Sequence, residues 1–423
     1  MQFSKKVLPN GLRIITVPMK DNGTVTAMVL VEAGSRYEDK QFAGISHFLE
    51  HMCFKGTTKR PNSLAISTEF ESMGAQYNAF TSANYTGYYG KAGAVKTESI
   101  IELVSDLYLN ATLPEDEIEK EKGVVIEEIN MYNDRPQSIV HEVFEELVYG
   151  DHPLGRPVIG FKDTVMNFTK VDLVQYRKKH YIPGKTLIII SGGFDEMSVI
   201  SQIENLFGSL PEQEIINKEK IEELQDKPKV KIFDKKTDQS HFIIGFRSFS
   251  YFDDRIDAVG LLRTILGSGM SSRLFNRLRE ELGLCYYVHA GHSAQSDCGL
   301  FTISAGVANL KLEEAVKEVM NVISKLLKEG ITDAELEKAK EFKIGNLYLS
   351  LETSDQFADW YGFQEISHEV IRNPKEEEES IRKVTREEVE TVARDVFDIK
   401  SANLGLIGPH KDKESVLLDL MKL

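Results

Sequence analysis

The segment GISHFLEHMCFKG, residues 44–56, constrains this chain more than any other stretch of it. Four apolar residues recur at the spacing of one helix face: Ile45, Phe48, Leu49 and Met52. His47, Glu50 and His51 are spaced i, i+3 and i+4, so they share another face of the same helix. Gly56 is a suitable residue to end it. The pattern predicts a helix that buries one side and presents two imidazoles with a carboxylate on the other.

Two imidazoles one turn apart are suited to a divalent metal. Zinc binds neutral imidazole nitrogens, and a hydrolytic zinc site keeps one coordination position for water. Glu50 lies between His47 and His51 and is predicted to accept a proton from that water. The order H-x-x-E-H is the inverted form of a zinc-peptidase signature. The alternative is a surface helix that carries two solvated histidines.

Composition excludes several classes of protein. A chain of 423 residues is too long for one core, so two or more domains are expected. No apolar run reaches membrane-spanning length, and a net charge of −15 disfavours a nucleic-acid partner. The N-terminus has two lysines but no apolar signal core, which predicts a cytoplasmic protein. Three cysteines without metal-type spacing, Cys53, Cys285 and Cys298, are predicted to be buried thiols.

Strand and helix patterns alternate along the first half. PNG between two short apolar runs predicts a hairpin near the N-terminus, and AQYNAFTSANYTGYYGKA predicts two more strands. TLIIISGG predicts a further strand. Helical periodicity covers 62–73, 97–111, a glutamate-rich stretch from 114, 138–149, 169–180 and 196–207.

A second copy of this pattern follows a charged, aperiodic segment. YFDDRIDAVGLLRTILG aligns with YEDKQFAGISHFLEHMC, and ITDAELEKAKEFKIGNLYL aligns with LPEDEIEKEKGVVIEEINM. We therefore predict a zinc-bearing domain at 1–208, a linker at 209–229 and a second, metal-free domain at 230–423.

The repeat also bears on the metal site. The second-copy counterparts of His47, Glu50 and His51 are Leu262, Ile265 and Leu266. Those of Glu121 and Glu128 are Ala339 and Asn346. Since the repeated fold does without charged residues at these positions, the first copy has them for another reason, and metal chemistry supplies one.

A catalytic zinc site needs a third protein ligand. Glu127 and Glu128 are candidates, with Glu121 nearby. Glu121 and Glu128 are seven residues apart and share a helix face, whereas Glu127 points elsewhere. The residues alone do not choose among them, because they do not show which face meets the histidine helix.

With these motifs in view, the chain resembles the pitrilysin/insulinase family of zinc peptidases, and its length is like that of the mitochondrial processing peptidase branch. The matching segments are 44–57, 78–89, 121–129, 152–156 and 279–286. The resemblance implies that Glu128 is the third ligand of one Zn²⁺ per chain and that Glu121 supports the metal's surroundings. It implies an α+β fold of two homologous domains, each an antiparallel sheet covered by helices.

The resemblance also implies where a peptide is held. Asn78, Ala79 and Phe80 match an edge strand that pairs with an extended substrate. Arg279 and Tyr286 match a pair that grips substrate carbonyls. Without the resemblance, Arg279 would be read as a surface helix residue and Tyr286 as a core aromatic.

These inferences predict a zinc endopeptidase that cleaves peptides or unfolded segments. Since the zinc motif and the Arg279/Tyr286 pair lie in one polypeptide, we expect a homodimer whose two subunits form a chamber. Two alternatives remain: a non-catalytic assembly subunit, and the zinc subunit of a heterodimeric peptidase.

Overall fold

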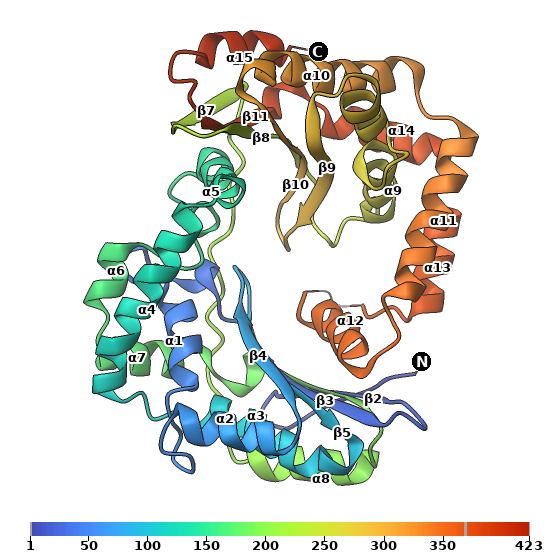
Figure 1. Cartoon of the computed structure of the whole chain (residues 1–423). Coiled ribbons are helices and arrows are strands. Elements are labelled where there is room, and N and C mark those ends of the chain that lie inside the picture. The colour runs from blue at the N-terminus through green and yellow to red at the C-terminus, as the bar shows by residue number, and fades with distance from the viewer. Residues whose placement is uncertain (1, 368–369, 423) are drawn as a thin grey trace. The chain divides into compact units, whose positions relative to one another are not determined.

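The computed structural model describes residues 2–367 and 370–422, and its chain divides into two compact units. Figure 1 shows their elements. Unit 1 comprises residues 1–131, 156–219 and 350–373. Unit 2 comprises residues 132–155, 220–349 and 374–423. Each unit therefore contains one segment from the other half of the sequence.

Unit 1 is built on a six-stranded sheet with the order β1-β2-β6-β3-β5-β4. Its strands are β1 (Ser4–Val7), β2 (Arg13–Pro18), β3 (Thr24–Val31), β4 (Gln76–Thr81), β5 (Thr86–Gly93) and β6 (Thr186–Gly192). All neighbours are antiparallel except the pair β2–β6. The predicted hairpin at PNG joins β1 to β2, and β4 forms an edge of the sheet.

Helices cover this sheet. They are α1 (Ile45–Cys53), α2 (Ser63–Ser72), α3 (Thr97–Asn110), α4 (Glu115–Asn133), α6 (Lys162–Asn167), α7 (Lys170–His180), α8 (Glu196–Phe207) and α12 (Ser354–Ser367). Of these, α3 packs on β3 and β5, and α12 packs on β2, β3 and β6. Tyr361 and Phe357 of α12 are buried against Ile15, Met28 and Ile189 of the strands. The late segment 350–373 thus completes the core of unit 1.

Unit 2 has a five-stranded sheet with the order β7-β11-β8-β10-β9. Its strands are β7 (Lys229–Asp234), β8 (Gln239–Ser248), β9 (Cys285–Ala294), β10 (Gly299–Ala308) and β11 (Asn403–Gly408). Its helices are α5 (Pro136–Tyr149), α9 (Ile256–Gly267), α10 (Leu312–Glu329), α11 (Asp333–Leu349), α13 (Pro374–Lys383), α14 (Arg386–Val396) and α15 (Glu414–Leu420). Here β11 and β7 form the one parallel pair, and α5 packs on β7, β8 and β11.

The α+β class with two helix-covered sheets is confirmed. The sheets are mixed rather than wholly antiparallel, because β6 and β11 each return from a distant part of the sequence and lie parallel to one neighbour. The order of elements repeats: α1 and α9 follow β3 and β8, and α4 and α11 occupy equivalent places later in each copy. The helices α5 and α12, which also occupy equivalent places, each pack on the sheet of the other copy.

The boundaries expected from the sequence, 1–208, 209–229 and 230–423, divide the chain into two contiguous halves and a linker. In the structure, the segment that carries α5 belongs to unit 2, and the segment that carries α12 belongs to unit 1. Residues 211–228 form neither helix nor strand. Within the described ranges, no helix has both the length and the apolarity needed to cross a bilayer.

Candidate metal centre

The helix α1 starts at a backbone arrangement that requires glycine. Gly44, the residue before its first turn, has φ +94°, and a Cβ there would lie 2.6 Å from the carbonyl oxygen of Ile159. The buried carboxylate of Glu38 accepts hydrogen bonds from the backbone N–H groups of Gly44 (2.7 Å) and Ser46 (2.8 Å). These donors have no partner within the helix, and Glu38 satisfies them. Burial raises the pKa of Glu38 to about 7, although the hydrogen bonds from Ser46 and Gly44 favour its charged form.

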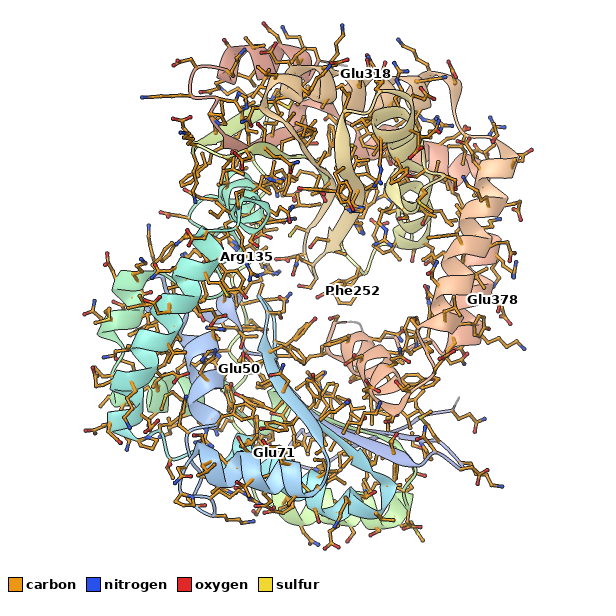
Figure 2. All side chains as sticks on the ribbon, in the orientation of Figure 1. Glu50, Glu71, Arg135, Phe252, Glu318 and Glu378 are labelled. Atoms are coloured by element: carbon orange, nitrogen blue, oxygen red, sulfur yellow. The ribbon has the colours of Figure 1, made fainter. Side chains whose placement is uncertain are left out.

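The two faces of α1 separate as their spacing predicts. Ile45, Phe48, Leu49 and Met52 are all buried. Glu50 is only 8% exposed, although it belongs to the polar face, and Figure 2 shows it on α1 beside β4. Glu50 is therefore enclosed by other elements of unit 1, whereas His47 and His51 on the same face remain partly exposed.

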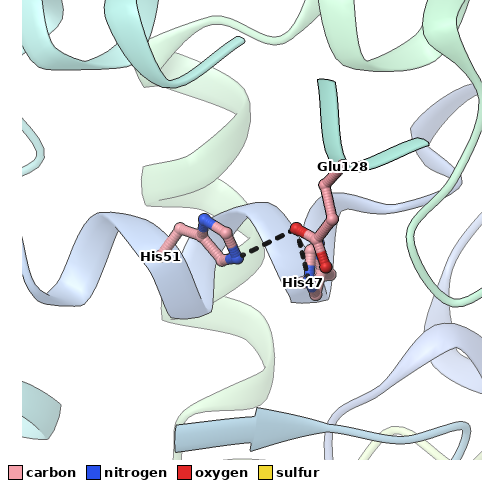
Figure 3. Close-up of side chains that lie close together, drawn as sticks. All are labelled: His47, His51 and Glu128. Atoms are coloured by element: carbon pink, nitrogen blue, oxygen red, sulfur yellow. Dashed lines mark ion pairs between the residues drawn. The ribbon is translucent and has the colours of Figure 1, made fainter. Parts of the chain in front are cut away.

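His47, His51 and Glu128 come together between α1 and α4 (Figure 3). Oε2 of Glu128 lies 3.8 Å from Nε2 of His47 and 3.7 Å from Nε2 of His51. Tetrahedral zinc with nitrogen and oxygen ligands holds neighbouring donor atoms roughly 3.3 Å apart. The two distances to Glu128 exceed this spacing by about half an ångström, and the three donor atoms all lie within 4.8 Å of one another, so the three side chains face a common position for one ion. Among the residues that the structure describes, no other group of histidine, cysteine and carboxylate donors meets this arrangement.

Glu121 orients one of the imidazoles. Its Oε1 lies 2.8 Å from Nδ1 of His51, while its Oε2 pairs with Nζ of Lys55 at 2.5 Å. Burial favours a raised pKa for Glu121, but the hydrogen bonds from His51 and Lys55 lower it, so this carboxylate is ionised. An ionised Glu121 keeps the proton of His51 on Nδ1 and leaves the lone pair of Nε2 directed at Glu128.

The surroundings of the two histidines shift their pKa values in opposite directions. Burial and the neighbouring His51 lower the pKa of His47 to about 3, so His47 is a neutral donor at physiological pH. For His51, burial acts in the same direction, but the hydrogen bond to Glu121 and the charges of Glu50 and Glu128 raise its pKa. A cation among these carboxylates and a proton would compete for the same nitrogen of His51.

Glu50 is held from the opposite side by a strand. The hydroxyl of Thr81, the last residue of β4, donates to Oε2 of Glu50 at 2.5 Å. Burial raises the pKa of Glu50, and this hydrogen bond partly offsets the effect. A carboxylate with a raised pKa is suited to accept and release a proton near neutral pH.

The structure distinguishes between the two neighbouring glutamates of α4. Glu127 is exposed and interacts with Asn130 one turn later, at 3.4 Å. Glu128 is half-buried and turned toward His47 and His51. The face shared by Glu121 and Glu128 is the one that meets α1.

Asn78, Ala79 and Phe80 lie in β4, the strand at the edge of the first sheet. One side of β4 pairs with β5, with Ala79 opposite Tyr88. As an edge strand, β4 presents backbone groups on its other side that can pair with an added strand. Thr81 places the end of this strand in direct contact with Glu50.

Arg279 and Tyr286 lie together in unit 2. A guanidinium nitrogen of Arg279 donates to the carbonyl of Tyr286 at 2.6 Å, and the guanidinium lies 4.9 Å from the centre of its ring. Tyr286 is 76% exposed, at the start of the edge strand β9, so it is not the core aromatic that burial statistics suggest. The two side chains form an exposed pair on the second unit.

Two contacting residues, Thr81 and Lys55, were missed by sequence reasoning. Thr81 follows Ala79 by two positions, and strand alternation could have placed both on one face of β4. Lys55 lies four residues after His51, yet it extends past the last residue of α1 to reach Glu121. No local pattern predicts the second contact, because it depends on how α4 packs on α1.

Comparison with known families and proteins gives matches over most of the chain. Residues 13–162 match the family described as Insulinase (Peptidase family M16), and residues 167–342 match the Peptidase M16 inactive domain. An uncharacterized zinc protease of Bacillus subtilis is 36% identical over 404 residues, which cover 95% of this chain and 97% of that protein. An uncharacterized zinc protease of Streptomyces coelicolor is 33% identical over 97% of this chain and 90% of its own length.

Solved structures share the fold. A protease from Helicobacter pylori superposes with a TM-score of 0.91 at 24% identity, covering 96% of this chain and 99% of its own. A peptidase M16 inactive domain from Pseudomonas fluorescens has a TM-score of 0.88 at 19% identity, covering 97% of this chain and 98% of that one. At these identities the likeness concerns the fold alone.

Proposed function

Because the chain belongs to the insulinase family of peptidases, family M16, we propose that it is a zinc-dependent endopeptidase acting on peptides or unfolded segments. The observation that carries the proposal is the convergence of His47, His51 and Glu128, with Glu50 beside them. Two histidines, one carboxylate and an open position form a known catalytic zinc set. Two similar proteins, which are named as uncharacterized zinc proteases, agree with this metal.

In this proposal each side chain has a separate task. His47, His51 and Glu128 would hold one Zn²⁺ per chain. Bound zinc would polarise a peptide carbonyl and make a water molecule acidic. Glu50 accepts the proton of the attacking water on its carboxylate and delivers it to the leaving amine, while Thr81 keeps that carboxylate oriented. Glu121 holds the ring of His51.

Substrate binding is assigned to two regions. An extended peptide would pair with the free edge of β4 along Asn78, Ala79 and Phe80, where main-chain hydrogen bonds give affinity without dictating sequence. The exposed Arg279 and Tyr286 supply donors that suit peptide carbonyls, including charge that develops on the oxygen of the cleaved bond.

We further propose a homodimer in which the first domain of one subunit faces the second domain of the other and encloses a chamber. The presence of the metal ligands and the Arg279/Tyr286 pair in one chain supports it. A cytoplasmic location and a place in the processing-peptidase-like branch also remain predictions. Sedimentation measured together with activity tests the assembly: an active species that is only monomeric would exclude the dimer.

The decisive experiment for the activity compares the wild type with Glu50→Gln on a library of quenched peptides. We expect hydrolysis that a chelator abolishes and zinc restores. Glu50→Gln should keep one zinc per chain and lose at least about 100-fold in turnover, because a general base contributes that much or more. Glu71→Gln, which changes an exposed residue of α2, is the matched control and should keep full activity.

Other results would favour the alternatives. Turnover of Glu50→Gln at the wild-type rate would contradict the role given to this residue. No hydrolysis by the zinc-loaded chain alone, but hydrolysis once a second chain is added, would identify a heterodimeric peptidase. No hydrolysis under either condition would favour a non-catalytic assembly subunit.

A further inference from the structure

A pocket of about 310 Å³ lies in unit 1, on the side of the sheet where α12 packs. Figure 1 shows α12 next to the strands. The residues that matter most for its chemistry are four aromatic and two acidic ones: Phe80, Tyr85, Tyr89, Phe363, Asp355 and Asp359. Neither metal ligands nor Glu50 line it. The pocket is therefore separate from the metal centre, although both involve β4.

Aromatic rings form its walls. The ring of Phe363 lies 5.9 Å from that of Phe80 and 5.4 Å from that of Tyr85, measured between centroids. The ring of Phe80 also lies 6.4 Å from that of Tyr89. Faces of such rings carry partial negative charge and attract a cation placed over them.

The two acidic residues of the pocket differ in their partners. Asp355 pairs with Lys91 at 2.6 Å and accepts a hydrogen bond from Thr353 at 2.6 Å, so its charge is balanced within the protein. The carboxylate of Asp359, one turn later on α12, has no hydrogen bond or ion pair with any side chain or backbone group in the described ranges 2–367 and 370–422. Burial and the charge of Asp355 raise the pKa of Asp359 to about 6.

Partial burial weakens the hydration of an unpaired carboxylate, and a cationic partner would restore the lost stabilisation. At neutral pH the group of Lys91, Asp355 and Asp359 has one uncompensated negative charge. A ligand with one positive charge would balance it, and the aromatic walls would stabilise the same cation.

The strand β4 connects this pocket to the proposed cleavage site. Thr81 projects to the face of Glu50, while its neighbour Phe80 projects to the face of the pocket. Side chains of an extended peptide alternate between the two faces in the same way. Every second side chain of a peptide paired with β4 would therefore lie on the pocket's side of the sheet.

We propose that this pocket binds an arginine or lysine side chain of a peptide extended along β4, with Asp359 as its counterion. This inference rests on the proposed peptidase function, because that function places an extended peptide along β4. A guanidinium fits the chemistry best, because it is planar, stacks on aromatic rings and pairs with carboxylates.

The first test uses a set of quenched peptides in which one arginine is moved position by position, each paired with a peptide that has neutral, isosteric citrulline there. In the wild type we expect one position at which arginine is preferred about tenfold in kcat/KM. Asp359→Asn should reduce that preference to less than twofold. Glu352→Gln removes an exposed charge close to α12 but outside the pocket, and should leave the preference unchanged.

A preference that survives in Asp359→Asn, or falls equally in Glu352→Gln, would overturn the proposal. Thermal unfolding of Asp359→Asn checks that the chain is folded, and Asp359→Ser serves as a second variant with the same expected result. Because Asp359 has no partner to lose within the described chain, both variants should fold.

A binding measurement separates this proposal from the proposed activity. Labelled arginine and citrulline peptides are titrated against Glu50→Gln and against Glu50→Gln/Asp359→Asn, and anisotropy reports binding. Tighter binding of arginine peptide that disappears in the double variant supports the pocket even if no peptide is hydrolysed. Equal binding of both peptides by Glu50→Gln would overturn the pocket while leaving hydrolysis by the wild type intact.

Discussion

Replacing Glu121 by glutamine tests how the metal centre is supported. Glu121 uses both oxygens, one toward Nδ1 of His51 at 2.8 Å and one toward Nζ of Lys55 at 2.5 Å. Glutamine has one acceptor oxygen and one donor nitrogen, so it can serve only one of these partners. Either His51 loses the acceptor that fixes its ring, or the ammonium of Lys55 faces an amide donor.

The expected cost is a 10- to 100-fold weaker affinity for zinc, the usual effect of removing a residue that orients a metal-bound histidine. This equals about 1.4 to 2.7 kcal/mol of binding free energy. Competition with a chromophoric chelator measures the affinity directly. It should be measured at several rising pH values, because protons compete with the metal for His51, whose pKa is raised by the hydrogen bond to Glu121.

Glu127→Gln is the matched control, because it makes the same chemical change on the exposed side of α4. It should bind zinc like the wild type. If Glu121→Gln also retained wild-type affinity while folded, the contact between Glu121 and His51 would have no part in holding the metal, and the reasoning would be refuted.

Two predictions concern stability. Burial lowers the pKa of His180 to about 3, and the charges of Lys185 and Lys179 act in the same direction. Below pH 6.5 the unfolded chain therefore takes up a proton that the folded chain does not. The stability of the folded chain falls as the pH falls for this reason. At pH 5 this lowers the free energy of unfolding by about 2 kcal/mol. Between pH 7 and pH 5, the free energy of unfolding of His180→Phe, measured in urea titrations, should therefore fall by about 2 kcal/mol less than that of the wild type. An equal fall in both proteins would contradict the lowered pKa of His180. Gly405→Ala would place a Cβ 2.9 Å from the backbone of Phe144 and should lower the free energy of unfolding by about 1 to 3 kcal/mol, whereas Gly345→Ala, in an open helical position, should not lower it. Equal stability of these two variants would show that α5 is not packed on β11 as closely as described.

The sequence predicts local features of this protein well, because they depend on spacing within one element. The positions of His47, Glu50 and His51 on one face follow from helical periodicity alone. Asn62 caps α2 by accepting a hydrogen bond from the backbone of Ala65, as its residue type suggests.

Features that depend on packing between distant elements could not be predicted in the same way. Residue spacing left Glu127 and Glu128 both open, because the contact of α4 with α1 decides which of them is turned inward. Periodicity predicted a helix over 138–149, where the structure has α5, but periodicity does not specify which sheet a helix covers. Asp359 had no local signal either, since its pocket is formed by β4, β5 and α12 together.

The central claim is that Glu128 of α4 completes a metal site begun by His47 and His51 of α1. Crystals of the zinc-loaded chain, with anomalous scattering recorded at the zinc edge, test it most directly. We predict one zinc per chain, within about 2.0 to 2.2 Å of Nε2 of both histidines and of a carboxylate oxygen of Glu128. Zinc bound elsewhere, or bound by the two histidines with Glu128 turned away, would contradict the account.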